Sequence, residues 1–225
     1  MVHMARTGRP RTFTDDEAID AATEVFWQHG YAGTTMRRLG DGAGVLPGSL
    51  HAAFGDKHAL FLRALERYTS RQREFGQSLK ETGPVLPRLR QMMYGIAEAA
   101  AAEEPRGCLL GNTAAELADI DPVAAVIVRD AFAELEAAVA QALARAQREG
   151  EVAQAVDTSA YARVLVALMQ GLHILARVRT EPRHLRQAVD AAFALLAVDL
   201  PESATPSSRL ADSLASPKSV RSRTV

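Results

Sequence analysis

Apolar residues recur every three to four positions along most of the chain, whereas alternating β-branched or aromatic segments are nearly absent. The first periodic stretch begins at a capping box over Thr14–Glu17 and ends at Gly30. Its inward face consists of Ala18, Ala21, Ala22, Val25 and Phe26. This spacing predicts an all-α protein of about nine helices.

Start and stop signals place the other helices. Two short helices flank a tight turn at Ala43–Val45, one ending near Gly42 and one running from Pro47 to about Ala53. A longer helix follows the Asp56 cap. Five more are expected over residues 84–103, 108–118, 121–149, 157–179 and 181–198.

The helix start and stop signals, together with changes in composition, divide the chain into four segments. Residues 1–13 form a basic arm that carries Arg6, Arg9 and Arg11 and no acid, and we expect it to be flexible. Residues 14–60 form a small helical domain, and residues 61–199 a larger one. Residues 200–225 are rich in Ser, Pro and Thr with few large apolar groups, so we expect this tail to be disordered.

Composition narrows the class of protein. The chain has 225 residues, a formal net charge of −1 and 48% hydrophobic residues, which is typical of a globular protein. One cysteine excludes an internal disulfide framework and a Cys-rich zinc site. The apolar runs fall short of the roughly 18–20 residues of a membrane span, and no secretory signal is evident. We therefore expect a cytoplasmic protein with no membrane partner.

The helix pair around the turn is a candidate DNA-binding element. Gly44 permits the turn, and Pro47, Gly48 and Ser49 keep the start of the second helix slim enough to enter a major groove. Basic side chains nearby would neutralise phosphates. The candidate contact residues are Arg9, Arg11, Thr35, Arg37, Pro47, Gly48, Ser49, His51 and Lys57.

The topology alone leaves another interpretation open. Short helix pairs with a glycine turn are common in helical proteins. Charge does not decide between the two, because residues 1–65 hold equal numbers of basic and acidic side chains. The acids of the first helix would have to face away from DNA.

Two segments carry a family resemblance. Residues 26–39 (FWQHGYAGTTMRRL) and 43–60 (AGVLPGSLHAAFGDKHAL) resemble the signature of tetracycline-repressor-type (TetR family) regulators. The resemblance implies that residues 14–60 bind DNA, and that residues 61–199 bind a ligand and dimerise. It also implies a homodimer that a small effector releases from its operator.

The chain departs from the family pattern at several positions. His51 stands where the family usually has a phosphate-contacting tyrosine, Ala53 replaces a frequent histidine or tyrosine, and Leu46 replaces a common Ser/Thr cap. Gly40 and Gly42 replace residues that are often alanine, at a cost of roughly 0.5–1 kcal/mol each in a helix. These changes bear on individual base contacts.

Family members usually dimerise through their last two helices, here within residues 158–198. Apolar positions in both helices, with Gly171 allowing close approach, fit such a four-helix bundle. The alternative is an ordinary core within one chain. The candidate interface residues are Leu165, Leu168, Leu172, Leu185, Val189, Phe193 and Leu196.

Cys108 is a candidate sensor. A thiol at a helix N-terminus, with Arg106 close in sequence, could ionise and react with electrophiles or oxidants, or bind a soft metal. The alternative is a small buried hydrophobe. Residues 107–113 (GCLLGNT) resemble a family subgroup that includes repressors answering electrophiles, oxidants or copper. Met92, Met93, Met169, His173 and His184 show no recognisable ligand spacing, so we predict no metal and no cofactor.

A conventional effector pocket is the other way to sense a signal. By the family resemblance it would lie among the helices of residues 85–175. The candidate lining residues are Met93, Ile96, Cys108, Leu117, Ile127 and Met169.

These observations favour a dimeric DNA-binding repressor with a pseudo-palindromic operator, released by a small effector or by modification of Cys108. No Gly-rich phosphate loop, His-Glu-x-x-His run or Gly-x-Ser-x-Gly elbow is present, so we do not expect an enzyme. Two alternatives remain: a regulator that answers only a non-covalent hydrophobic inducer, and an interaction module without DNA binding.

Overall fold

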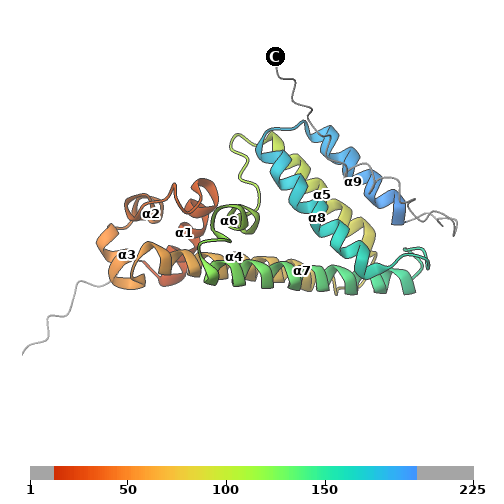
Figure 1. The fold of residues 1–225 in the computed structure, drawn as a ribbon, viewed down its shortest axis with the longest axis horizontal. Helices are drawn as coiled ribbons and strands as arrows, with labels where there is room; N and C mark the ends of the chain where they lie inside the picture. The colour runs from red at the N-terminus through yellow and green to blue at the C-terminus, as the bar shows by residue number, and fades with distance from the viewer. Residues whose placement is uncertain (1–12, 197–225) are drawn as a thin grey trace, which may run out of the picture.

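The computed structural model describes residues 13–196, which form nine α-helices, one short 3₁₀ helix and no strand (Figure 1). This confirms the all-α prediction. The helices are α1 (Asp15–His29), α2 (Met36–Ala43), α3 (Pro47–Phe54), α4 (Lys57–Ser78), α5 (Val85–Glu98), α6 (Leu109–Leu117), α7 (Pro122–Arg148), α8 (Thr158–Arg177) and α9 (Pro182–Leu196), with the 3₁₀ helix η1 at Ala99–Ala101.

The first core joins helices that are distant in sequence. Phe26 of α1 is fully buried against the rings of Tyr31 and Phe61. The same cluster includes Leu39 and Leu50 from α2 and α3, and it is completed by α6 and the first half of α7. The DNA-binding candidate therefore packs on α1 and α4 at one end of the molecule, while α6 packs against α1, α4 and α7 (Figure 1).

The second core lies at the other end, among α5, α8, α9 and the second half of α7 (Figure 1). Six of the seven side chains predicted to contact a second protomer are at most 5% exposed within one chain, so they also belong to this core. Side chains of such low exposure offer little surface to a second protomer. The six are Leu165, Leu172, Leu185, Val189, Phe193 and Leu196, whereas Leu168 is half-buried.

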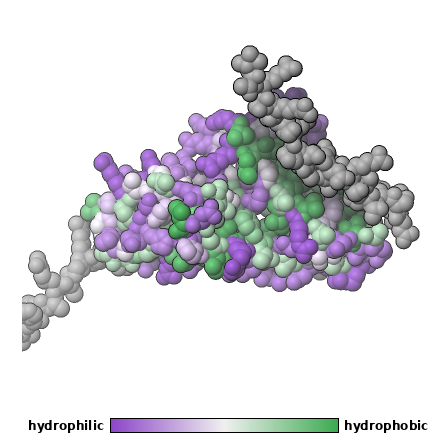
Figure 2. All heavy atoms as spheres, in the orientation of Figure 1, coloured by the Kyte–Doolittle hydropathy of each residue, from purple (hydrophilic) through white to green (hydrophobic). Residues whose placement is uncertain are grey.

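Different positions of the last two helices carry exposed apolar side chains. α8 exposes Val164, Ile174 and Leu175, and Val178 follows directly after it. Leu195 is half exposed on α9. Figure 2 shows hydrophobic side chains gathered along α8 on the face turned to the viewer. By length and hydropathy alone α8 could also cross a membrane, although one third of that window is buried inside the fold.

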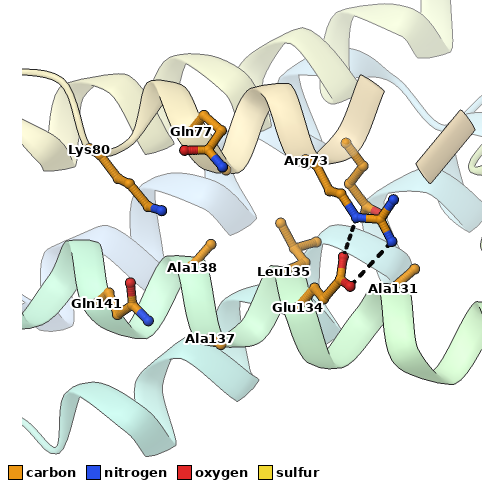
Figure 3. Close-up of a pocket in the computed structure, with 11 residues that line it drawn as sticks. Arg73, Gln77, Lys80, Ala131, Glu134, Leu135, Ala137, Ala138 and Gln141 are labelled. Atoms are coloured by element: carbon orange, nitrogen blue, oxygen red, sulfur yellow. Dashed lines mark hydrogen bonds and ion pairs between the residues drawn. The ribbon is translucent and has the colours of Figure 1, made fainter. Parts of the chain in front are cut away.

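The long helices α4 and α7 run side by side and connect the two cores. Arg73 of α4 pairs with Glu134 of α7, with Nε 2.6 Å from Oε2 (Figure 3). A Cβ built at Gly76 would lie 3.3 Å from the Cβ of Ala138, so the helices approach closely there. A shallow pocket of about 350 Å³ lies between them.

Two predicted segments lie mostly outside the described residues. These are the basic arm, with the DNA-binding candidates Arg9 and Arg11, and the tail of residues 200–225. Phe13, the last residue of the predicted arm, is described and packs against the first core.

Candidate DNA-binding surface and internal cavity

The α2–α3 pair is fixed by local contacts that its sequence dictates. The Thr35 hydroxyl accepts a hydrogen bond from the Arg38 amide and caps α2. Gly44 ends α2 in the left-handed conformation at φ 66°, which a side chain would strain. Leu39 and Leu50 are fully buried and anchor the two helices. The pair is therefore a preformed unit.

The start of α3 is open to solvent. Gly48, Ser49 and His51 are exposed, as is Arg37 on α2, while Pro47 is half-buried at the first turn of α3. α3 has no side-chain cap, since Leu46 occupies the cap position. These side chains are free to meet another molecule.

Three of the acids of α1 are paired with arginines outside the helix. Asp16 pairs with Arg67, and Asp20 lies 2.9 Å from Arg71. Glu24 pairs with Arg71 at 3.0 Å and also with Arg106. Their charge is thus locally balanced, which reduces the repulsion that a nearby phosphate backbone would meet.

The contacts of Lys57 differ from the phosphate contact predicted for this residue. Its Nζ donates to the carbonyl oxygens of Tyr31 and Thr34, at 3.0 and 3.2 Å, and lies 4.0 Å from the centroid of the Tyr31 ring. An ammonium held in this way fixes the link between α1 and α2. In this structure Lys57 positions the helix pair and does not reach outward.

Glu116 of α6 holds the same link from the other side. Its carboxylate accepts the amide hydrogens of Tyr31 at 2.9 Å and Ala32 at 2.5 Å. A Cβ at Gly30 would lie 2.9 Å from Glu116 Oε2, and Gly30 has φ 70°. The sequence gives no sign of this role, because Glu116 is a single acid on an ordinary amphipathic helix.

A cavity of about 320 Å³ lies between α1, α4, α5, α7 and α8. Three predicted effector residues line it, namely Ile96, Cys108 and Met169. The other three do not line it: Met93 is buried in the second core, and Leu117 and Ile127 pack in the first. The sequence did not single out the aromatic lining residues Trp27, Tyr68 and Phe75.

Cys108 is buried at the cap position of α6 but makes no side-chain capping bond. The Tyr68 hydroxyl donates toward its sulfur over 3.8 Å. Burial, followed by the nearby Cys108, raises the pKa of Tyr68, so this hydroxyl stays protonated. Arg106 pairs with Glu24 and lies over the Trp27 ring. The guanidinium expected to act on Cys108 is thus already paired with a carboxylate.

His173 also lines the cavity, and burial lowers its pKa to about 4. A second cavity of about 720 Å³ shares Cys108, Gln170 and His173 and extends to Gly30 and Glu116. The second pocket thus reaches the link that precedes α2. No group of three His, Cys, Asp or Glu side chains in residues 13–196 could hold a metal ion.

An exposed helix pair joined to a helical body with an apolar pocket defines a helix-turn-helix regulator. Comparison with known proteins gives the family. Residues 18–64 match the family described as bacterial regulatory proteins, tetR family, and residues 85–192 match the tetracyclin repressor-like C-terminal domain. The chain belongs to the tetR family of bacterial regulatory proteins. It is a DNA-binding transcriptional regulator and not an enzyme.

Individual relatives cover most of the chain. It is 31% identical to the HTH-type transcriptional repressor ComR of Escherichia coli over 76% of this chain and 82% of ComR. It is 29% identical to the uncharacterized regulator YezE of Bacillus subtilis over 84% of this chain and 99% of YezE. A cysteine mutant of the regulator CifR, solved with 26 bp double-strand operator DNA, aligns with a TM-score of 0.71 at 26% identity over 84% of this chain and 100% of CifR.

Proposed function

We propose that the protein is a transcriptional repressor that binds operator DNA through the start of α3. The observation that carries the proposal is the exposure of Gly48, Ser49 and His51 on a helix anchored by the buried Leu50. A slim, exposed helix start is what a major groove admits. The CifR complex with operator DNA and the repressor ComR support this assignment. Repression takes place in the cytoplasm, where the chromosome lies.

The repressor acts as a homodimer. The exposed apolar side chains Val164, Ile174 and Leu175 on α8 are the surface that a second copy would cover. Gly171 has open space around its α-carbon, which permits close approach of another helix. A two-fold dimer places its two reading helices about 34–36 Å apart, so the operator is a pseudo-palindrome. The predicted arm residues Arg9 and Arg11 would add phosphate contacts.

A small effector, or modification of Cys108, releases the repressor. α6 supports both routes, since Cys108 precedes its first turn and Glu116 near its end holds the α1–α2 link. A ligand in the cavity that shifts α6 would therefore move the DNA-binding helices. The burial of the thiol beside a largely apolar pocket makes a non-covalent effector the second candidate.

Selection of genomic DNA fragments by the purified protein tests the proposal. We expect enrichment of a pseudo-palindromic sequence, with binding that weakens steeply as salt rises. Retention of no fragment, or of fragments without a shared sequence, would instead indicate an interaction module without DNA binding.

The variant Cys108→Ser tests the covalent route separately. It should bind the selected operator like the parent but resist release by an alkylating reagent such as N-ethylmaleimide. Equal release of both proteins would exclude Cys108 as the point of modification and leave the non-covalent route.

A further inference from the structure

The shape and lining of the 320 Å³ cavity define the kind of molecule it can hold. Its volume is at the lower end of the range for small-molecule sites. Three rings line it, from Trp27, Tyr68 and Phe75, together with the thioethers of Met92 and Met169. Rings and thioethers favour flat apolar molecules, which stack against aromatic faces and edges.

The charges around the cavity are already matched. Arg71 is the one lining side chain with a permanent charge, and its guanidinium lies 2.9 Å from Asp20 and 3.0 Å from Glu24. Burial keeps His173 neutral near pH 7 by lowering its pKa to about 4. An ion in this pocket would give up part of its hydration and find no unpaired opposite charge among the lining side chains. The lining therefore selects against charged molecules.

A few polar groups can still orient a ligand. The amides of Gln72 and Gln170 and the imidazole of His173 line an otherwise apolar space. Small-molecule sites commonly combine an apolar wall with a small number of polar groups. This set suits one or two hydrogen-bonding atoms on the ligand.

Trp27 brings a residue of the N-terminal family domain into the lining of the cavity. It lies on α1, within the segment that matches the N-terminal family domain. Its indole Nε1 donates to the Gly107 carbonyl at 2.8 Å, directly before Cys108 and α6. Its ring also packs edge-on against Tyr68, with centroids 5.2 Å apart. A ligand in the cavity would touch α1 and the segment that leads into α6 together.

We propose that this cavity binds an uncharged, flat, largely apolar molecule with one or two hydrogen-bonding atoms, which lies against the Trp27 indole. The inference rests on the proposed function, because it names the class of effector for that repressor.

Two probes of matched size test the inference on the full chain. Trp27 is the only tryptophan of the sequence, so its fluorescence reports on the cavity. We expect 2-acetylnaphthalene to quench it saturably, with a Kd below about 100 μM. 2-Naphthoate, which differs mainly by its negative charge, should bind at least about tenfold more weakly. Equal or tighter binding of 2-naphthoate, or no saturable binding of 2-acetylnaphthalene, would overturn the inference.

A matched pair of variants locates the bound probe. Ile96→Phe adds volume in the cavity and should weaken 2-acetylnaphthalene binding at least about tenfold, whereas Ile127→Phe adds the same volume outside it and should not. Unchanged affinity in a folded Ile96→Phe protein would contradict the location. If this variant does not fold, binding of the two probes to the unmodified chain still decides which class of ligand the cavity holds.

Fragment retention measured on the same preparation separates the two proposals. Probe binding without DNA retention would overturn the proposed function and leave the cavity assignment standing. DNA retention without probe binding would overturn the cavity assignment alone.

Discussion

Glu116 shows how a single side chain can couple two parts of this regulator. Its carboxylate accepts two amide hydrogens from the link that precedes α2, and Lys57 holds two carbonyl oxygens of the same link. Donors that face a charged acceptor form stronger hydrogen bonds than donors that face a neutral one. The link is thus fixed by opposite charges from α6 and α4.

We predict that Glu116→Gln lowers the free energy of unfolding by about 1 kcal/mol, because the neutral amide is a weaker acceptor for two backbone donors. Asp119→Asn removes the same charge three residues away at an exposed position and should change stability by less than about 0.5 kcal/mol. Urea denaturation of the three proteins measures the difference. Equal stability of all three proteins would show that Glu116 does not stabilise the link that precedes α2.

His173 predicts a pH dependence of stability. Burial lowers its pKa to about 4 from an ordinary value of 6.5, so between these values the unfolded chain binds a proton that the folded chain does not. His173 therefore makes stability fall as pH drops from about 6.5 toward 4. The contribution is at most about 3 kcal/mol, since one pKa unit corresponds to about 1.4 kcal/mol.

The variant His173→Gln should lose this part of the acid sensitivity. Denaturation of both proteins at pH 7 and pH 4.5 checks the prediction, because other titrating groups cancel in the comparison. The same stability loss on acidification in both proteins would show that His173 is not the group responsible.

The sequence could predict some of these residues and not others. Thr35, Pro47 and Gly44 follow from capping and turn chemistry that is local in the chain. Glu116, Trp27 and the internal hydrogen bonds of Lys57 depend on contacts across 23 to 85 positions, which no local pattern encodes. Arg106 was expected beside Cys108 because the two are close in sequence, but Glu24 on another helix engages it.

At the scale of elements, helix boundaries were the most predictable feature. The capping box at Thr14 and the caps at Asp56, Asp121 and Asp157 each begin a helix where expected. Which face a helix buries was harder to predict. Apolar residues on both sides of α8 and α9 gave no means of separating core from interface, and six of the candidate interface residues are buried within one chain.

Two glycines of the α2–α3 pair differ in the space available for a side chain. A Cβ at Gly40 would lie 2.7 Å from the Val45 carbonyl oxygen and 3.2 Å from Pro47, whereas Gly48 has nothing within 4 Å. Gly40→Ala should therefore lower stability by about 1–3 kcal/mol despite the better helix propensity of alanine. Gly48→Ala should raise it by up to about 1 kcal/mol.

Thermal unfolding followed by circular dichroism compares the two glycine variants directly. A Gly40→Ala protein more stable than the parent would mean that α2 and α3 do not pack as closely as the structure shows.

At the scale of the whole molecule, α4 and α7 connect an exposed helix pair at one end to the helices of the proposed dimer at the other (Figure 1). Both long helices also line the cavity, through Tyr68 and Leu135 for example. A ligand in this cavity would therefore contact α4 and α7, the two helices that connect the DNA-binding end to the proposed dimer end. This arrangement fits a regulator whose effector acts at a distance from DNA.

The proposed dimer surface predicts that charged side chains introduced on α8 weaken dimerisation. Val164→Glu combined with Leu175→Glu should raise the dimer dissociation constant at least about 100-fold, because two carboxylates would be buried without partners. Val126→Glu alters a comparably exposed valine on α7 and should leave the dimer intact. Sedimentation velocity over a range of concentrations separates these outcomes. Identical profiles for the double variant and the parent would place the dimer surface elsewhere.

The central claim is that the start of α3 reads DNA, and fluorescence anisotropy with the selected operator tests it most directly. The account predicts binding at least about 1,000-fold tighter than to a scrambled duplex of equal length. It also predicts at least a roughly tenfold loss for Ser49→Ala combined with His51→Ala, with no loss for the exposed Ser159→Ala on α8. Equal affinity for the two duplexes, or a double variant that binds like the parent, would contradict it.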